Sequence, residues 1–83
     1  MSERFENILW GIDGEIRETL YKLSTVTKQN TQEIRLRQGL PLAITVLGET
    51  VFVKRNGQTS FFPQKDLQFV TKENVENSFR KLF

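Results

Sequence analysis

The stretch that decides the fold is EIRLRQGLPL, residues Glu33 to Leu42. Its first half alternates charged and aliphatic side chains, which puts Ile34 and Leu36 on one face. Alternation with a period of two is typical of a β-strand with one buried face and one face in water. Gly39 and Pro41 then interrupt the pattern, and proline suits only the entry of the next strand or a sheet edge because it has no N–H to donate. The stretch predicts a first strand followed by a turn.

Arg35 and Arg37 alternate with those aliphatic residues and fall together on the wet face of the predicted strand. Side chains two positions apart along a strand are separated by about 6.5–7 Å. Three interpretations are open: a grip on nucleic acid, a contact with another subunit, or plain hydrated surface. A contact would be made with an acidic surface, or with a nucleotide, on a neighbouring domain, because a guanidinium group binds carboxylates and phosphates through paired hydrogen bonds. Arg35 and Arg37 are the candidate partner-binding residues.

The segment before this strand is predicted to be helical over residues 2–23. Its apolar residues recur at steps of three and four, which places them on one helix face. They are Phe5, Ile8, Leu9, Ile12, Ile16, Leu20 and Leu23. Two glycines at positions 11 and 14 weaken the helix between them, so we expect two helices with Ser2 and Asp13 as their N-caps. Residues 24–32 are polar with β-branched side chains and are predicted to form a loop.

The segment 33–62 is predicted to form a small, mainly antiparallel sheet of three or four strands. After the opening strand, strands over 42–47, 50–54 and 59–62 are separated by two turn sequences. Gly48-Glu49 fits a type II′ turn, and Asn56-Gly57 is a strong hairpin sequence. A final helix over residues 72–82 is expected to begin after the N-cap Thr71 and to pack on one face of the sheet. Its apolar face would consist of Val75, Phe79 and Leu82. The predicted fold class is α+β.

Several large side chains have two interpretations each. Trp10 is predicted to pack in the core at the helix break, with an interaction anchor as the alternative. Phe61 and Phe62 would put one ring on each face of the last strand, one in the core and the other either covered by a helix or exposed for docking. The pair Lys54-Arg55 beside the Asn-Gly turn is predicted to be a hydrated hairpin tip, with a phosphate contact as the alternative.

The composition removes most catalytic chemistry from these 83 residues. There is no histidine and no cysteine, which excludes the usual nucleophile systems and nearly all zinc sites. The ten acidic residues are scattered, and neither a G-x-x-x-x-G-K-[ST] nor a G-x-G-x-x-G loop occurs. We therefore expect no catalytic residue, no metal site and no cofactor in this chain. Since no run approaches the about 20 apolar residues of a membrane span, we expect a cytoplasmic domain without membrane insertion.

The charge is unevenly distributed along the chain. Residues 1–33 carry four basic and six acidic side chains, a net charge of −2, whereas residues 34–83 carry eight basic and four acidic ones, a net charge of +4. Opposite bias in the two halves favours docking onto a partner. The basic excess is smaller than in a dedicated nucleic-acid binder, and the core is expected to use the rings of Phe52, Phe61 and Phe62. A small stand-alone nucleic-acid-binding protein is therefore the alternative function.

The sequence also resembles a known family. EIRLRQGLPLAITVLGETVF, followed after a gap by VTKENVENSFRKLF, resembles the N-terminal region of the stage III sporulation protein AA family. The preceding ILWGIDGEIRETLYKL is similar to the start of that family, where a helix breaks and forms again. The block Glu33–Leu42 is the most specific part of the resemblance, and residues 55–69 match loosely.

This resemblance implies a particular role. The family is related to hexameric secretion and pilus-retraction ATPases, in which an N-terminal α+β domain precedes the ATPase core. It implies that residues 1–83 are a single N-terminal domain, or part of one, of a longer chain that binds ATP and Mg²⁺ beyond Phe83. The parent protein would act at the cytoplasmic face of a channel between mother cell and forespore. The expected partners are neighbouring subunits of the ring and membrane proteins of the channel. If later strands complete the sheet, the isolated chain would self-associate through an unfinished sheet edge.

Overall fold

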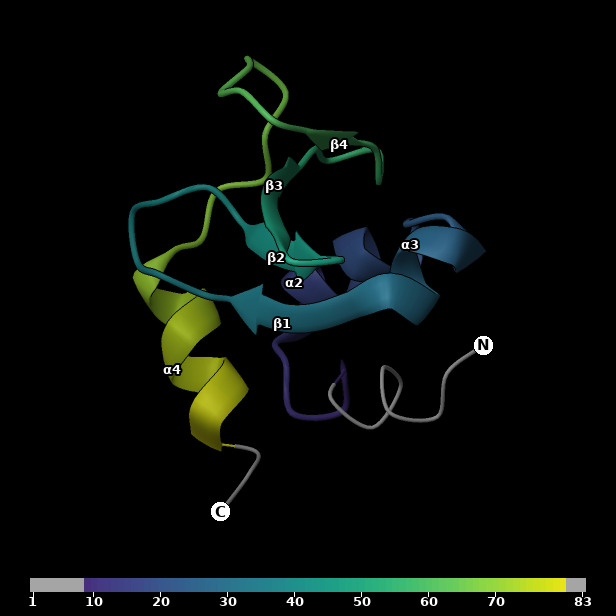
Figure 1. Ribbon diagram of the computed structural model, residues 1–83. Coiled ribbons are helices and arrows are strands. Elements are labelled where there is room, and N and C mark those ends of the chain that lie inside the picture. The colour runs from purple at the N-terminus through teal and green to yellow at the C-terminus, as the bar shows by residue number, and fades with distance from the viewer. Residues whose placement is uncertain (1–8, 81–83) are drawn as a thin grey trace.

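The computed structural model describes residues 9–80, with side chains up to Ser78, and has an α+β arrangement in which one sheet is backed by helices (Figure 1). The elements are α2 (Gly14–Tyr21), α3 (Thr25–Asn30), β1 (Thr31–Arg35), β2 (Ala43–Val46), β3 (Glu49–Val53), β4 (Thr59–Ser60) and α4 (Lys72–Arg80). The four strands form one antiparallel sheet in the order β1-β2-β3-β4. The predicted fold class is confirmed. The predictions for Ser2, Phe5, Ile8, the Phe79 side chain and Leu82 lie outside the described part of the chain.

Strand register divides the sheet into an inner and an outer face. Ile34 pairs with Ile44, and Ile44 with Val51, so these three residues form an inner row. The next row, on the outer face, runs Arg35, Ala43, Phe52 and Ser60. Because side chains alternate along each strand, the aliphatic half of the opening stretch turns toward the helices. The structure of β1 therefore confirms the prediction that its isoleucine lies on the inner face and its arginine on the outer face.

The core lies between the inner face and α2. Ile16 and Leu20 of α2 are fully buried and belong to the same cluster as Ile44 and Val53 of the sheet. The remaining buried members of the cluster are Leu9, Ile12, Leu23, Leu42, Val51 and Val70. Each such aliphatic side chain contributes roughly 1.5–3 kcal/mol through burial. The apolar residues that recur with helical periodicity in the sequence thus form the side of α2 that packs against the sheet.

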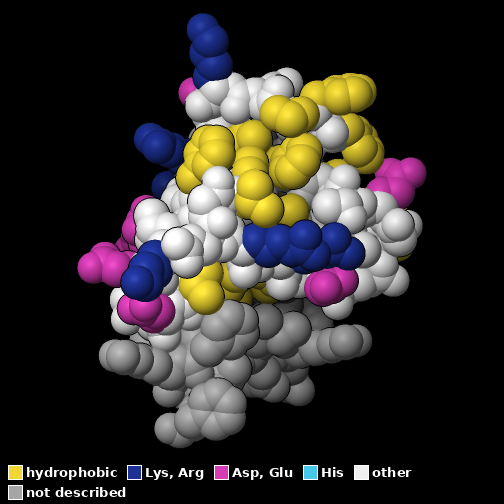
Figure 2. All heavy atoms as spheres, turned by 90° about the vertical axis from the view of Figure 1, so that its left-hand side faces the viewer, with side chains coloured by type: hydrophobic (Ala, Val, Ile, Leu, Met, Phe, Trp, Pro, Cys, Tyr) yellow, Lys and Arg dark blue, Asp and Glu magenta, His cyan; other side chains and the backbone are white. Residues whose placement is uncertain are grey.

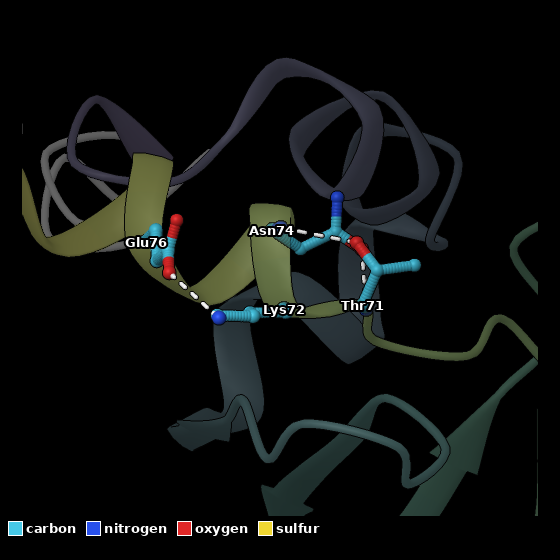
Figure 3. Close-up of polar contacts among 4 residues, drawn as sticks. All are labelled: Thr71, Lys72, Asn74 and Glu76. Atoms are coloured by element: carbon cyan, nitrogen blue, oxygen red, sulfur yellow. Dashed lines mark hydrogen bonds and ion pairs between the residues drawn. The ribbon is translucent and has the colours of Figure 1, made fainter.

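Two helix starts meet in a buried polar network. The chain leaves the helical path at Trp10 and starts α2 after Asp13, as predicted, but the Asp13 carboxylate does not cap its own helix. It accepts a hydrogen bond of 2.8 Å from Asn74 Nδ2 instead. At the start of α4, Thr71 Oγ1 accepts from the Asn74 amide at 3.1 Å and Asn74 Oδ1 accepts from the Thr71 amide at 2.8 Å (Figure 3). Thr71 is the predicted N-cap, and the reciprocal bond completes a capping box with asparagine at its third position.

The prediction of a loop over residues 24–32 is wrong. Thr25–Asn30 form helix α3, and β1 follows without a gap at Thr31. The Ser24 hydroxyl accepts from the Thr27 amide at 3.2 Å, and Asn30 Nδ2 donates to the Val26 carbonyl at 2.9 Å. Side chains thus satisfy the backbone groups that a six-residue helix leaves unpaired at its ends, and this offsets the weak helix propensity of threonine and valine.

The turn between β2 and β3 is displaced by one residue from its prediction. Val46 pairs with Glu49, so the two turn residues are Leu47 (φ 51°) and Gly48 (φ 82°). Two consecutive positive φ values indicate a type I′ turn rather than type II′, with a leucine at a position that usually favours Asn, Asp or Gly. The Asn56-Gly57 turn is found where it was predicted, with Gly57 at φ 90°.

Two chain segments extend the sheet beyond the strands. The Leu42 amide donates to the Gln68 carbonyl at 2.6 Å, and the Gln68 amide donates to the Val53 carbonyl at 2.9 Å. Two residues further along the same segment, the Val70 amide donates to the Leu40 carbonyl at 2.9 Å. The segment 66–70 therefore lies against both the loop after β1 and the end of β3, where Figure 1 shows it running down into α4. These bonds hold residues 39–42 in place.

Candidate functional site

A hollow of about 280 Å³ opens on the outer face of the sheet. Its lining is mainly apolar and comes from β2, β3 and the loops on either side. The apolar members are Leu40, Pro41, Ala43, Phe52 and Pro63. Arg35, Arg37 and Thr50 complete the lining, and we call this site the outer-face hollow. Figure 2 shows apolar side chains gathered on this side of the molecule with a band of basic side chains along their border.

The structure brings the two candidate arginines to this one site. Arg35 is the last residue of β1, and Arg37 follows in the loop, so the strand ends earlier than predicted. Both still line the same hollow. Arg35 Nε lies 3.7 Å from Glu33 Oε1, an ion pair whose side chains are 40% and 57% exposed. Exposed pairs of this kind contribute little to stability, and Arg37 takes part in no ion pair among the described residues.

One buried donor in the site lacks an acceptor. Arg35 Nε is shielded from solvent and finds no hydrogen-bond partner among the described residues. The same holds for Thr45 Oγ1, which belongs to the outer face through the pairing of Thr45 with Glu33. Most buried polar atoms in proteins have a partner. The outer face therefore has unused hydrogen-bonding capacity beside an apolar hollow.

The prediction that one ring of the Phe61-Phe62 pair enters the core is wrong. Both are exposed, at 62% and 74%, because β4 ends at Ser60. The Ser60 hydroxyl accepts from the Phe62 amide at 3.2 Å and donates to the Phe62 carbonyl at 2.8 Å. These local bonds replace the strand ladder and turn the chain away from the sheet. Phe62 directly precedes Pro63 of the outer-face hollow in the chain, whereas Phe61 lines a separate hollow with Val46 and Val51.

Trp10 is also outside the core, contrary to the prediction. Its side chain is 69% exposed, and the Arg17 guanidinium lies 5.8 Å from its ring centroid. The helix break is filled by Leu9 and Ile12, which are buried, so no room is left for the indole.

At the other end of the sheet, Arg55 is exposed, as expected for a hairpin tip. Lys54 is instead half-buried and forms an isolated β-bridge with Leu67.

Sequence reasoning identified the two arginines but missed the apolar half of the hollow. Pro41 is predicted to lie at the turn after the first strand, and prolines and isolated leucines such as Leu40 and Pro63 carry no obvious functional signal. Only the bonds between residues 39–42 and 66–70 place the Leu40-Pro41 segment at the sheet. Phe52 could have been found, because the alternation of β3 puts it opposite Val51 and Val53.

The side chains of the outer-face hollow offer two kinds of contact. The hollow contains guanidinium groups, a hydroxyl and apolar side chains, which recognise anionic and apolar groups together. Among residues 9–80, no group of three His, Cys, Asp or Glu side chains is placed to hold a metal ion. In the same range, no helix has both the length and the apolar character needed to cross a membrane. Comparisons with protein-family models, curated proteins and solved structures found no match to this chain.

Proposed function

We propose that this chain is a non-catalytic docking and oligomerisation domain whose contact surface is the outer-face hollow. With the sequence resemblance, it would be the N-terminal domain of a sporulation secretion-type ATPase. The parent protein would bind ATP and Mg²⁺ in a separate core and act at the cytoplasmic face of a channel complex. Neighbouring subunits of the ring and membrane proteins of the channel are the proposed partners.

One observation carries the proposal: Arg35 and Arg37 line the same apolar hollow on the sheet face opposite the core. A surface that joins apolar area to guanidinium groups has the chemistry of a binding hot spot, where arginine and aromatic residues are enriched. The rigid sheet beneath would let the domain move as one unit against a neighbouring subunit. The hollow offers the hydroxyl of Thr50, but no general base to activate it among the lining residues.

Charge reversal in the full-length protein tests this function. Replacing both arginines, Arg35→Glu with Arg37→Glu, should impair ring assembly or ATPase turnover while the domain stays folded. Sizing chromatography, ATP hydrolysis and the circular dichroism of the domain measure the three quantities. Unchanged assembly and turnover would rule out the proposed contact. Reading the open frame past Phe83 for a Walker A motif tests the family assignment separately.

A second candidate function, binding of single-stranded nucleic acid, is favoured by the exposure of Phe61 and Phe62. Because neither ring lies in the core, both are available for contact with a base. Exposed rings near basic side chains form the stacking platforms that such proteins use. Binding of a ten-nucleotide oligo(dT) that weakens steeply with salt would support this function. No binding at about 50 mM salt, where phosphate contacts are strong, would remove it.

A further inference from the structure

We propose that the outer-face hollow binds a short acidic peptide of a partner protein, with one aromatic or large aliphatic side chain inserted between the arginines and Phe52. This inference rests on the proposed docking function and deepens it by naming the chemistry of the occupant. The partner segment would carry carboxylates on one or both sides of its apolar anchor.

The size of the hollow favours a single side chain as the anchor. Its volume of about 280 Å³ lies just under the roughly 300–1,000 Å³ of sites that enclose small molecules and cofactors. Its apolar walls come from Leu40 and Pro41 on one loop and Pro63 on another, with Ala43 and Phe52 contributed by neighbouring strands. Side chains held between sheet and loops leave a concave apolar surface, where an inserted ring loses the most water.

The charge at the hollow favours carboxylates beside that anchor. Two guanidinium groups line the site, and the only acidic residue paired with either in the described structure is Glu33, at 3.7 Å from Arg35 Nε. That separation exceeds hydrogen-bond length, which agrees with the lack of a bonded acceptor for this nitrogen. Arg37 is exposed. A carboxylate arriving with the peptide would bind the exposed parts of the two guanidinium groups, through charge-assisted bonds that are stronger than neutral ones.

Other occupants fit these observations less well. A nucleic-acid strand needs successive stacking platforms and a track of cations along its backbone, whereas this site has two arginines on one side of a single hollow. A second copy of this chain would bring single exposed acidic side chains, among them Glu15 and Glu18 of α2 and Glu76 of α4. Glu76 pairs with Lys72 at 3.9 Å. Glu15 is already engaged, since its carboxylate accepts from Gln68 and Asn74 at 3.3 Å each.

A peptide titration tests the inference directly. The probe is a fluorescein-labelled hexapeptide, DEDFDE, followed by fluorescence anisotropy and by amide shifts of the labelled protein at about 50 mM salt. We expect saturable binding with the largest shifts in residues 35–43 and 50–52. The peptides DEDSDE, without the anchor, and QNQFQN, without the carboxylates, should each bind at least tenfold more weakly, because each lacks one half of the recognition.

Matched variants of the protein locate the site. Arg35→Gln with Arg37→Gln should weaken DEDFDE binding at least tenfold, whereas Arg55→Gln with Lys72→Gln, which removes the same charge outside the hollow, should leave it within about twofold. Phe52→Ala should weaken binding with the charge kept. Circular dichroism checks that each variant is folded.

Four results would overturn the inference. Equal weakening by both charge-removing pairs would show non-specific attraction. Tighter binding of oligo(dT) to the same residues would assign the hollow to nucleic acid, and a concentration-dependent dimer that protects it would assign it to a second copy. If DEDFDE fails to bind while the Arg35→Glu, Arg37→Glu protein still loses assembly, the peptide inference is wrong and the docking function stands.

Discussion

The inner and outer faces of the sheet use the same strands but end in different surroundings. The inner row Ile34, Ile44 and Val51 packs with α2 into one cluster. The outer row Arg35, Ala43 and Phe52 has no covering helix, and in its place two loops leave a hollow. An antiparallel sheet commonly buries one face and keeps the other in water. Here the second face is neither plainly polar nor covered, which is why we propose that a partner binds it.

Under the proposed function, residues of the inner face serve stability and residues of the outer face serve binding. Changes on the inner side remove contacts that every folded molecule needs, and they should lower the free energy of unfolding. Changes on the outer side remove contacts that only a complex would make, and they should leave unfolding nearly unaltered. Each variant described below can contradict this division between the inner and the outer face.

The largest loss of stability is expected at Gly57, where the sheet meets the helical side of the domain. A Cβ at this position would lie 2.5 Å from both the Cβ and the carbonyl oxygen of Lys22, at a backbone φ of +90°. The strained backbone costs on the order of 1–3 kcal/mol, and the overlap adds a similar amount. We expect Gly57→Ala to leave little folded protein, measured by urea unfolding.

Gly48 offers the matched control for that change. Its φ is +82°, and a Cβ there would meet nothing within 4 Å. Gly48→Ala should therefore pay only the backbone cost, and the difference between the two variants isolates the contact with Lys22. An equal loss of stability in both variants would show that the close contact with Lys22 adds nothing to the cost of the Gly57 change.

The next largest effect is expected in the middle of the inner row. Ile44 is completely buried, and Ile44→Ala should destabilise the fold by about 2–5 kcal/mol through lost burial and a residual cavity. Thermal unfolding followed by circular dichroism measures it. The control is the adjacent outer-face change Thr45→Val, which replaces a hydroxyl without a hydrogen-bond partner in the described structure. That variant should be at least as stable as the parent, since no bond is lost.

A smaller effect is expected from the polar network between the helices. Asn74 is 1% exposed and bonds Thr71 and Asp13 at once. Asn74→Ala should cost about 1–3 kcal/mol, because it leaves buried partners without hydrogen bonds. Asn77→Ala, which removes only an exposed contact of 3.4 Å to Asp13, should change the free energy of unfolding by less than about 0.5 kcal/mol. A similar cost in both variants would mean that the network does not hold α4 in place.

The smallest effect on folding is expected on the outer face. Arg35→Glu with Arg37→Glu removes one exposed ion pair and should change stability by less than about 1 kcal/mol. The same variant is expected to show the largest loss of assembly. Unfolding in urea compared with sizing of the full-length protein separates the two quantities. If the domain unfolds instead, the outer face belongs to the structure rather than to a contact.

Local patterns in the sequence predicted most of the framework. Periodicity placed α2 and the strands, Thr71 identified the start of α4, and Asn56-Gly57 identified a hairpin. These features depend on neighbours within a few positions. The errors come from residues whose surroundings are distant. Trp10 and one ring of the Phe61-Phe62 pair are predicted to lie in the core because of their hydrophobicity, but the core is filled by aliphatic side chains.

The sequence by itself determined the alternation of β1, and with it which side of the strand would hold Ile34 and which Arg35. Tertiary structure alone decided that the arginines would border a hollow. That hollow depends on bonds between residues 39–42 and 66–70, and on the placing of Pro63 beside Phe52, contacts across ten or more positions. Such pairings follow from the way the whole chain fills its core, and no short window of sequence contains them.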